Sequence, residues 1–330
     1  MRAAVLERLG EPPRYGSFAD PVPGDGEVLV EVRAAALHQI DRARASGRHY
    51  TSPTELPVIC GVDGVGTVTD EDGDPSRVWF ALPRAPYGSM AERTVASARM
   101  IAPLPDDLTD AQAAALINPG MAAMLPLAWR GKLAEGETAL ILGATGVAGR
   151  LAVQLAKLMG AGRVVAAGRD PRALESLSDL GADTLIRLDR PKDELAAEFA
   201  AQAGSDGYKV IVDYVWGDPT EALLAALTVH EFKGATWETR LVQVGDMAGP
   251  TIALPAEVLR SAPITLVGSG GFAPPPVRAR CYGDLVAHAA AGRLRIDTEE
   301  FPLAEVAEAW SRGDRDGRRQ VLVTERGASQ

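Results

Sequence analysis

The sequence predicts an α/β protein in which a doubly wound parallel sheet is inserted into a smaller, mostly antiparallel β-rich domain. Three observations lead to this fold. Short β-type runs punctuated by proline and glycine fill residues 1–118, apolar strands alternate with amphipathic helices over 119–270, and a short segment, 271–330, ends in one more strand. Alternating strands and helices are typical of βαβ units. The last segment is too small for a separate domain, so we expect it to complete the first one.

The pattern of the first part predicts a compact β domain, because its short apolar runs are separated by turn residues. Examples are Val28–Val32, Gly64–Val68 and Arg77–Phe80, with Pro21–Gly26 as one of the intervening loops. Such spacing indicates antiparallel strands joined by tight connections, which together form a barrel-like domain.

In the middle part, short apolar runs that are typical of strands alternate with amphipathic segments that are typical of helices. This alternation predicts a parallel sheet covered by helices. The expected strands are Thr138–Leu142, Arg163–Ala167, Lys209–Asp213, Arg240–Val244 and Ile264–Val267, and the expected helices are Gly146–Met159, Pro171–Leu180, Asp193–Ala203 and Thr220–Leu227. In the last part, Pro274–Pro276 is expected to interrupt regular structure. Helices over Arg278–Ala291 and Leu303–Trp310, a strand over Gln320–Val323 and a frayed end over Gly327–Gln330 should follow.

Charge and composition narrow the class of protein. The net charge of −10 comes from interspersed acids and bases, whereas phosphate binding needs clustered positive charge, so we expect no nucleic-acid partner. No run approaches the roughly 18 apolar residues of a membrane helix, and Glu7 comes too early for a signal peptide. We expect a cytoplasmic protein with a small-molecule substrate and no membrane contact. Cys60 and Cys281 are expected to be reduced thiols.

The strongest local signal is a glycine turn between a strand and a helix, LGATGVAG at 142–149. Gly146 would let the backbone approach a diphosphate, and Gly149 would let the helix pack on the strand. Ala144 holds the first glycine position of the G-x-G-x-x-G motif, so the match is imperfect, and a tight turn without a ligand is the alternative. The candidate cofactor contacts are Ala144, Thr145, Gly146, Val147 and Ala148.

The end of the next strand favours NADPH over NADH. Gly168 occupies the tip, where an NAD enzyme usually has an acid that binds the ribose hydroxyls. Asp170 has roughly the right spacing, but it precedes Pro171 and is better interpreted as a helix N-cap. Arg169 and Arg172 could then surround a 2′-phosphate. The alternative is that both arginines are solvated surface residues.

A series of short motifs follows along nearly the whole chain. They are Met1–Val5, Pro23–Val30, Ala34–Asp41, Pro57–Gly66, Gly88–Glu92, Gly143–Gly149 and Leu180–Asp183. In this order they resemble the motifs of the medium-chain dehydrogenase/reductase (MDR) superfamily, and in particular its zinc-independent, quinone oxidoreductase-like branch. Several ordered motifs are far more specific than any single one.

The resemblance implies a GroES-like catalytic domain in two parts, 1–118 and 271–330, around a Rossmann NADP-binding domain, 119–270. It places the active site in the cleft and pairs two copies of the chain as a homodimer through an edge strand similar to residues 264–267. It also places the nicotinamide near Val215, Val244, Gly245, Gly268, Ser269 and Gly270. For these glycines, turn geometry alone is the alternative.

The chain departs from the zinc-dependent members of the superfamily. The positions of their catalytic zinc ligands resemble His38, Val62 and Asn118 here. Valine cannot bind zinc and asparagine is a poor ligand, while a catalytic site needs about three firm protein ligands. His38 and Asp63 do not complete such a set, so we expect no metal.

Without zinc, the charge that develops on a hydride acceptor has to be stabilised by hydrogen-bond donors. The segment that resembles the substrate wall offers two, His38 and Tyr50. The leading hypothesis is an NADPH-dependent reductase of a quinone or an α,β-unsaturated carbonyl. The alternatives are a biosynthetic enoyl or iminium reductase in which His38 donates the proton, and an NADPH-binding sensor or structural protein without turnover. His38 could instead only orient a loop, and Tyr50 could be a packing or surface residue.

Overall fold

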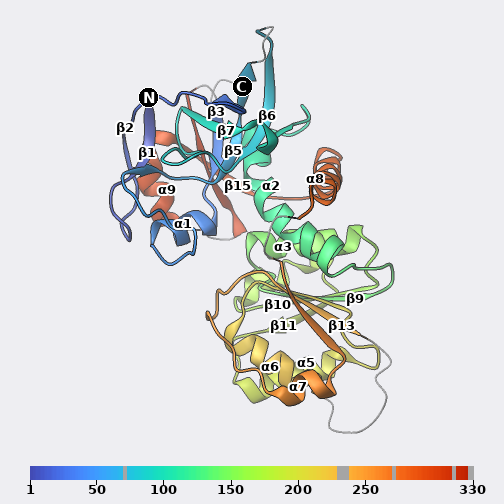
Figure 1. The fold of residues 1–330 in the computed structure, drawn as a ribbon. Helices are drawn as coiled ribbons and strands as arrows, with labels where there is room; N and C mark the ends of the chain where they lie inside the picture. Colours follow the sequence, from blue (N-terminus) through green and yellow to red (C-terminus); the bar gives the residue numbers. More distant parts are fainter. Residues whose placement is uncertain (70–72, 229–237, 270–272, 314–316, 326–330) are drawn as a thin grey trace. The chain divides into compact units, whose positions relative to one another are not determined.

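The computed structural model describes residues 1–330 except 70–72, 229–237, 270–272, 314–316 and 326–330 (Figure 1). The chain forms two compact units. The first comprises Met1–Asn118 and Val286–Gln330, and the second comprises Pro119–Leu285. The expected domain boundaries at 118 and 270 stay a prediction, and the expected frayed end, 327–330, lies outside the described residues.

The first unit is built from two sheets that are antiparallel except for one pair of strands. The larger sheet has the order β15-β16-β3-β5-β6-β8, with β7 also paired to β3, and the smaller has the order β2-β1-β4. Strand β16 pairs antiparallel to β3, so the end of the chain completes this unit as predicted. The bounds are β1 Arg2–Leu6, β2 Arg14–Ser17, β3 Glu27–Ala36, β4 Val58–Ile59, β5 Asp63–Thr69, β6 Pro75–Ala81, β7 Arg93–Ser97, β8 Ile101–Pro103, β15 Thr298–Pro302 and β16 Arg319–Val323.

The second unit contains a parallel sheet whose strand order reverses in the middle. The order is β11-β10-β9-β12-β13-β14. The chain moves outward from β9 through β10 to β11, and then returns to β12 on the other side of β9. The switch point of this doubly wound sheet therefore lies between β9 and β12, where such folds bind ligands at the carboxyl ends of the strands. The bounds are β9 Thr138–Leu142, β10 Arg163–Gly168, β11 Thr184–Arg187, β12 Val210–Asp213, β13 Thr239–Gln243 and β14 Ile264–Gly268.

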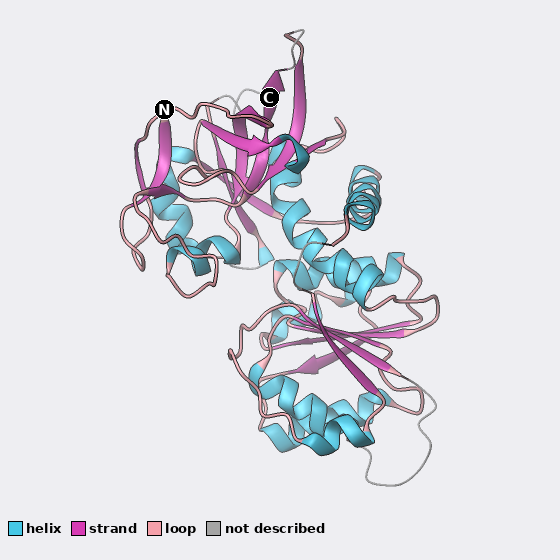
Figure 2. Ribbon diagram, in the orientation of Figure 1, coloured by secondary structure: helices cyan, strands magenta, loops and turns pink. Residues whose placement is uncertain are grey.

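Helices cover both faces of the parallel sheet, with α3 on one face and α5, α6 and α7 on the other (Figures 1 and 2). Helix α2 continues beyond its last residue into a π-helical turn over Leu125–Arg130. The α-helices described are α1 Gln39–Ala45, α2 Asp110–Met124, α3 Val147–Leu158, α4 Pro171–Glu175, α5 Lys192–Ala203, α6 Gly217–Leu227, α7 Ala256–Ser261, α8 Pro275–Ala290 and α9 Val306–Arg312.

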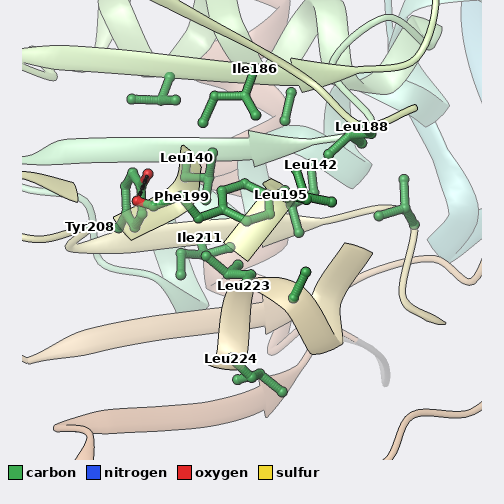
Figure 3. Close-up of a cluster of buried hydrophobic side chains, with 14 of the residues drawn as sticks. Leu140, Leu142, Ile186, Leu188, Leu195, Phe199, Tyr208, Ile211, Leu223 and Leu224 are labelled. Carbon is green, nitrogen blue, oxygen red and sulfur yellow. Dashed lines mark hydrogen bonds between the residues drawn. The ribbon is translucent and has the colours of Figure 1, made fainter. Parts of the chain in front are cut away.

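One hydrophobic cluster fixes the sheet of the second unit against α5 and α6 (Figure 3). Leu140 and Ile211 come from the adjacent strands β9 and β12, while Phe199 and Leu223 come from the two helices. All four are fully buried. The Tyr208 hydroxyl in the cluster donates to the Phe199 carbonyl at 2.8 Å, so its burial leaves no unpaired hydroxyl.

Three local expectations need correction. Helix α8 begins at Pro275, inside the proline cluster that was expected to precede it, because a proline in the first helical turn loses no hydrogen bond. Strands β11 and β15 were not anticipated. Both are short, and β15 carries Glu299 and Glu300 next to each other, which hides the alternation of a strand.

The expectation of no membrane-length apolar run is also wrong for one helix. Asp110–Arg130 is 21 residues long and reaches a mean hydropathy of 1.2, enough by length and composition to cross a membrane. However, 67% of the apolar window is buried inside the protein. A core helix of a soluble protein has the same composition, so this helix is weak support for a membrane span.

Candidate functional site

The turn between β9 and α3 has the geometry of a diphosphate-binding turn. Gly143 has a φ of +80°, which a glycine adopts readily. A Cβ at Gly149 would lie 2.3 Å from the Gly143 carbonyl oxygen, so only glycine lets α3 start this close to the turn. Gly146 is the N-cap, and no side chain caps the helix. The first amides of α3 are thus left for an anion, which the helix dipole also favours. The predicted contacts Ala144, Thr145 and Gly146 lie in this turn, and Val147 and Ala148 are the first two residues of α3.

The carboxyl end of β10 and the residues after it are expected to contact the ribose and its 2′-phosphate. Gly168 ends the strand and is buried beside Thr145 of the turn. The Asp170 carboxylate accepts from the Ala173 amide at 2.9 Å and caps α4, as predicted, so it is engaged in its own helix. Arg169 and Arg172 are both exposed. Neither forms an ion pair with the described residues, which leaves both guanidinium groups available to a phosphate.

At the end of β12, Asp213 organises the turn that contains Val215. Its buried carboxylate accepts from the Val215 amide at 2.8 Å, the Trp216 amide at 2.9 Å and the Thr220 hydroxyl at 2.6 Å. Burial raises the pKa of Asp213, which these three hydrogen bonds oppose. The amides of Val244 and Gly245 donate to the Asp213 carbonyl. Because the amides of Val215, Val244 and Gly245 are all paired with Asp213, these residues would contact a carboxamide through their carbonyl oxygens, which accept from its amino group.

Two of the remaining predicted cofactor contacts, Gly268 and Ser269, lie at the end of β14. Gly268 is the last residue of the strand, and the Ser269 amide donates to the Gln243 carbonyl at 2.8 Å. Gly270 lies outside the described residues. Strand β14 pairs with β13 and ends the sheet order of the described strands. Residues 264–267 are thus an edge strand in this unit, as the dimer hypothesis requires.

In the first unit, a buried polar cluster surrounds Asp63, the first residue of β5. His38 is 2% exposed, and its Nε2 atom lies 3.0 Å from Asp63 Oδ1. Asn118 donates to the same oxygen at 3.3 Å, and Trp79 donates to Oδ2 at 2.9 Å. The fold thus brings His38 and Asn118, two positions that resemble zinc-ligand positions, to one carboxylate. The third such position, Val62, is buried.

This donor set does not fit a catalytic zinc ion. An amide, a valine and one imidazole that faces a carboxylate do not supply three firm ligands. The part of the chain that the structure describes contains no group of three or more His, Cys, Asp and Glu residues arranged to hold a metal ion. Cys60 and Cys281 are both free and buried, as predicted, and burial raises the pKa of both thiols.

His38 also begins helix α1. Its amide donates to Asp41 Oδ2 at 2.8 Å, and its side chain and the Asp41 amide form the other half of a capping box. Asp41 is 3% exposed, and burial raises the pKa of its carboxyl to about 6 against the attraction of His38. The ring of His38 is therefore held between Asp63 and the start of α1. Its role as a proton donor stays a prediction.

Tyr50 lies on the loop between α1 and β4 and is 93% exposed. Its ring stacks on that of His49 with centroids 4.2 Å apart. Within the first unit the ring is apart from the buried His38 cluster, so Tyr50 and His38 do not form a joint hydrogen-bonding pair there. A substrate contact by Tyr50 also stays a prediction.

The sequence interpretation missed three polar residues that organise these sites. Asp213 ends an otherwise apolar strand, VIVD, and an acid in that position was a usable signal. Asp63 was considered only as an insufficient metal ligand. Trp79 carried no signal, because its contact with Asp63 depends on the pairing of β5 with β6.

Comparison with known proteins agrees with both units. The alcohol dehydrogenase GroES-like domain family matches residues 24–106, and the zinc-binding dehydrogenase family matches 148–280. A probable NADPH-dependent quinone reductase of Emericella nidulans is 28% identical over 365 residues, covering 98% of this chain and all of that protein.

Two solved structures extend this agreement to the fold. A probable oxidoreductase of Mycobacterium abscessus has a TM-score of 0.78 at 27% identity, covering 98% of each chain. The quinone oxidoreductase of Escherichia coli, solved with NADPH, has a TM-score of 0.83 at 20% identity, covering 98% of this chain and 100% of that one. The two family matches, the quinone reductase relative and the glycine turn at the switch point together establish that the chain belongs to the medium-chain dehydrogenase/reductase superfamily, in its quinone oxidoreductase-like branch.

Proposed function

We propose that this protein reduces a quinone or an α,β-unsaturated carbonyl with NADPH and without a catalytic zinc ion. Family membership and the relatives make the chain an NADPH-dependent oxidoreductase. The observation that carries the cofactor is the uncapped, glycine-built start of α3 at the switch point of the sheet. NADPH supplies a hydride when bound. The chain itself binds the diphosphate on the α3 amides and holds the 2′-phosphate with Arg169 and Arg172.

The substrate class follows from the chemistry of the residues that stand at the zinc-ligand positions. Simple carbonyls need strong charge stabilisation on one oxygen, which a metal ion provides. Quinones and conjugated carbonyls delocalise that charge, so hydrogen-bond donors suffice. The cluster of Asp63 with His38, Trp79 and Asn118 is a buried network of hydrogen-bonding groups, which supports a site without a metal ion.

Turnover tests the substrate class and the metal together. We expect NADPH oxidation with 1,4-quinones and cyclic enones, little with simple ketones, and no loss of rate after prolonged treatment with a zinc chelator. Metal analysis of the purified protein is the matching measurement. Stoichiometric zinc whose removal abolishes turnover would refute the proposal.

The cofactor preference rests on the arginines after β10. Arg169→Ala should weaken NADPH binding by about tenfold or more while leaving NADH binding within about twofold, because the lost charge pair involves only the 2′-phosphate. Arg260→Ala, an exposed arginine of α7, is the control. Tighter binding of NADH than NADPH by the unchanged protein would contradict the preference.

We also propose that two copies pair through β14 and that the protein is cytoplasmic. An edge strand exposes backbone donors and acceptors that a second copy can satisfy. The molar mass in solution, measured by light scattering, checks the pairing. A monomer at micromolar concentration would exclude it.

A further inference from the structure

Trp216 has a backbone conformation that is otherwise reserved for glycine. Its φ is 55° and its ψ is −160°. Side chains clash with the backbone in this region, so a non-glycine residue held there is strained. Such strain persists only where the surroundings enforce it.

The surroundings of Trp216 do enforce it. The fully buried Asp213 carboxylate binds the amides of both Val215 and Trp216. The Ala248 amide donates to the Val215 carbonyl at 2.7 Å and fastens the turn from the other side. These hydrogen bonds therefore fix the φ and ψ angles of Trp216, and a glycine would adopt the same angles without strain. The presence of an indole calls for a different reason.

The position of the turn suggests that reason. Trp216 follows the carboxyl end of β12, the strand beside β9 at the switch point. The turns that follow β9 and β12 lie close together, because a Cβ added at Gly143 would be 2.9 Å from Val215 Cγ1. With the diphosphate on α3 and the adenosine half toward Arg169 beyond β10, the nicotinamide half must extend toward β12 and β13. Trp216 stands on that side.

The indole ring is held by packing on one side and is exposed on the other. It is half-buried and packs against the hydrophobic cluster of the second unit, which fixes the ring, and the rest of its surface stays exposed. We propose that Trp216 is a positioning residue whose ring forms a wall for the nicotinamide riboside half of the cofactor. This inference rests on the proposed NADPH binding and goes beyond it, because it assigns Trp216 to the orientation of the reacting ring.

The test compares substitutions at Trp216 in titrations with NADPH. Trp216→Ala and Trp216→Gly should both weaken NADPH binding by about tenfold, and Trp216→Phe by less than about threefold, because a phenyl ring keeps most of the apolar contact. Quenching of tryptophan fluorescence by NADPH should fall sharply in Trp216→Phe despite its near-normal affinity. Lys132→Gly, which relieves another positive φ in the same unit, is the control and should bind like the unchanged protein.

Thermal unfolding without cofactor separates backbone strain from cofactor binding. Trp216→Gly should melt a few degrees above Trp216→Ala, because only glycine accepts the backbone angles. Circular dichroism confirms that each variant is folded. If Trp216→Ala and Trp216→Gly bind NADPH as tightly as the unchanged protein, or if Trp216→Phe binds as weakly as Trp216→Ala, the proposal is overturned. If the unchanged protein binds no NADPH, the proposed function itself fails, which is a distinguishable result.

Discussion

At the scale of single residues, the buried charges of the first unit are the most sensitive feature. Asp41 and Asp63 both lie beside His38, but their carboxylates differ in how many of their oxygens have hydrogen-bond partners. Asp63 receives contacts from Trp79, Asn118 and His38, whereas one oxygen of Asp41 has no hydrogen-bond partner within the described structure. A buried carboxylate that is incompletely paired is costly when ionised. Asp41 therefore weakens the fold when it carries charge.

This difference gives a pH-dependent prediction for Asp41. Its carboxyl pKa rises from 3.8 to about 6 on folding, so the folded state holds the proton more tightly, and stability falls as pH rises between those values. Asp41→Asn should raise the free energy of unfolding by about 1–2 kcal/mol at pH 7.5 and leave it nearly unchanged at pH 4. Urea unfolding at both pH values measures this. Asp106→Asn, at an exposed site, is the control, and an equal effect of Asp41→Asn at both pH values would contradict the prediction.

Residue identity alone could not have revealed this cluster. The sequence indicated His38, Asp63 and Asn118 separately, through motif resemblance. That His38 and Asn118 meet at the Asp63 carboxylate depends on where α1 and α2 pack in the first unit, and the Trp79 contact depends on β5 pairing with β6. Likewise, Trp216 precedes a glycine and carries no pattern that predicts a positive φ. Side-chain contacts between distant segments follow from the fold, which a single sequence does not spell out.

At the scale of elements, the start of α2 is attached to the large sheet through one carboxylate. Asp110 accepts from Arg33 Nε on β3 at 2.5 Å and from Arg77 Nε on β6 at 2.6 Å, with all three side chains at most 20% exposed. Arg77 also donates to the Pro105 carbonyl at 2.8 Å. If Asp110 lost its charge, the two guanidinium groups would stay largely buried without a countercharge.

We expect Asp110→Asn to lower the free energy of unfolding by about 2–3 kcal/mol, because both guanidinium groups lose their countercharge. Asp189→Asn is the matched comparison. Its pair with Arg187 is 39–46% exposed, so solvent screens it and the substitution should leave the free energy of unfolding nearly unchanged. Chemical unfolding of both variants measures the two costs, and equal costs would show that burial does not govern these ion pairs.

Elements with strong local signals were predicted closely, and those without were not. Strand β9 has the expected bounds, because the apolar run TALIL stops at a glycine that must turn. Helix α3 differs by one residue at each end, since Gly146 and Met159 cap it. The π-helical turn after α2 had no counterpart in the prediction, because its sequence, LPLAWR, has no periodicity that distinguishes it from an ordinary helix.

At the scale of the whole molecule, the proposed cofactor contacts all belong to one unit. The β9–α3 turn, the tip of β10 and the turn after β12 lie within Pro119–Leu285. Sequence reasoning predicted this unit well because βαβ repetition is local. It predicted no strand order for the first unit, because those pairings join distant segments.

NADPH should therefore stabilise the second unit directly. At a free concentration of about 100 times its Kd, a ligand that binds only the folded state adds about 2.7 kcal/mol. Hydrogen exchange with and without NADPH should show the added protection concentrated in residues 119–285, with the largest change at the start of α3. Protection confined to residues 1–118 would contradict the assignment of the cofactor site.

The pairing of β16 with β3 has a consequence for biosynthesis. Val321 faces Ala36, the Leu37 amide donates to the Gln320 carbonyl, and the Thr324 hydroxyl donates to the Val32 carbonyl. These partners are far apart in the sequence, so a ribosome releases β16 long after β3. The parallel sheet of the second unit can thus form before β16 is available to pair with β3. During that interval the unpaired edge of β3 is exposed to other chains in the cell.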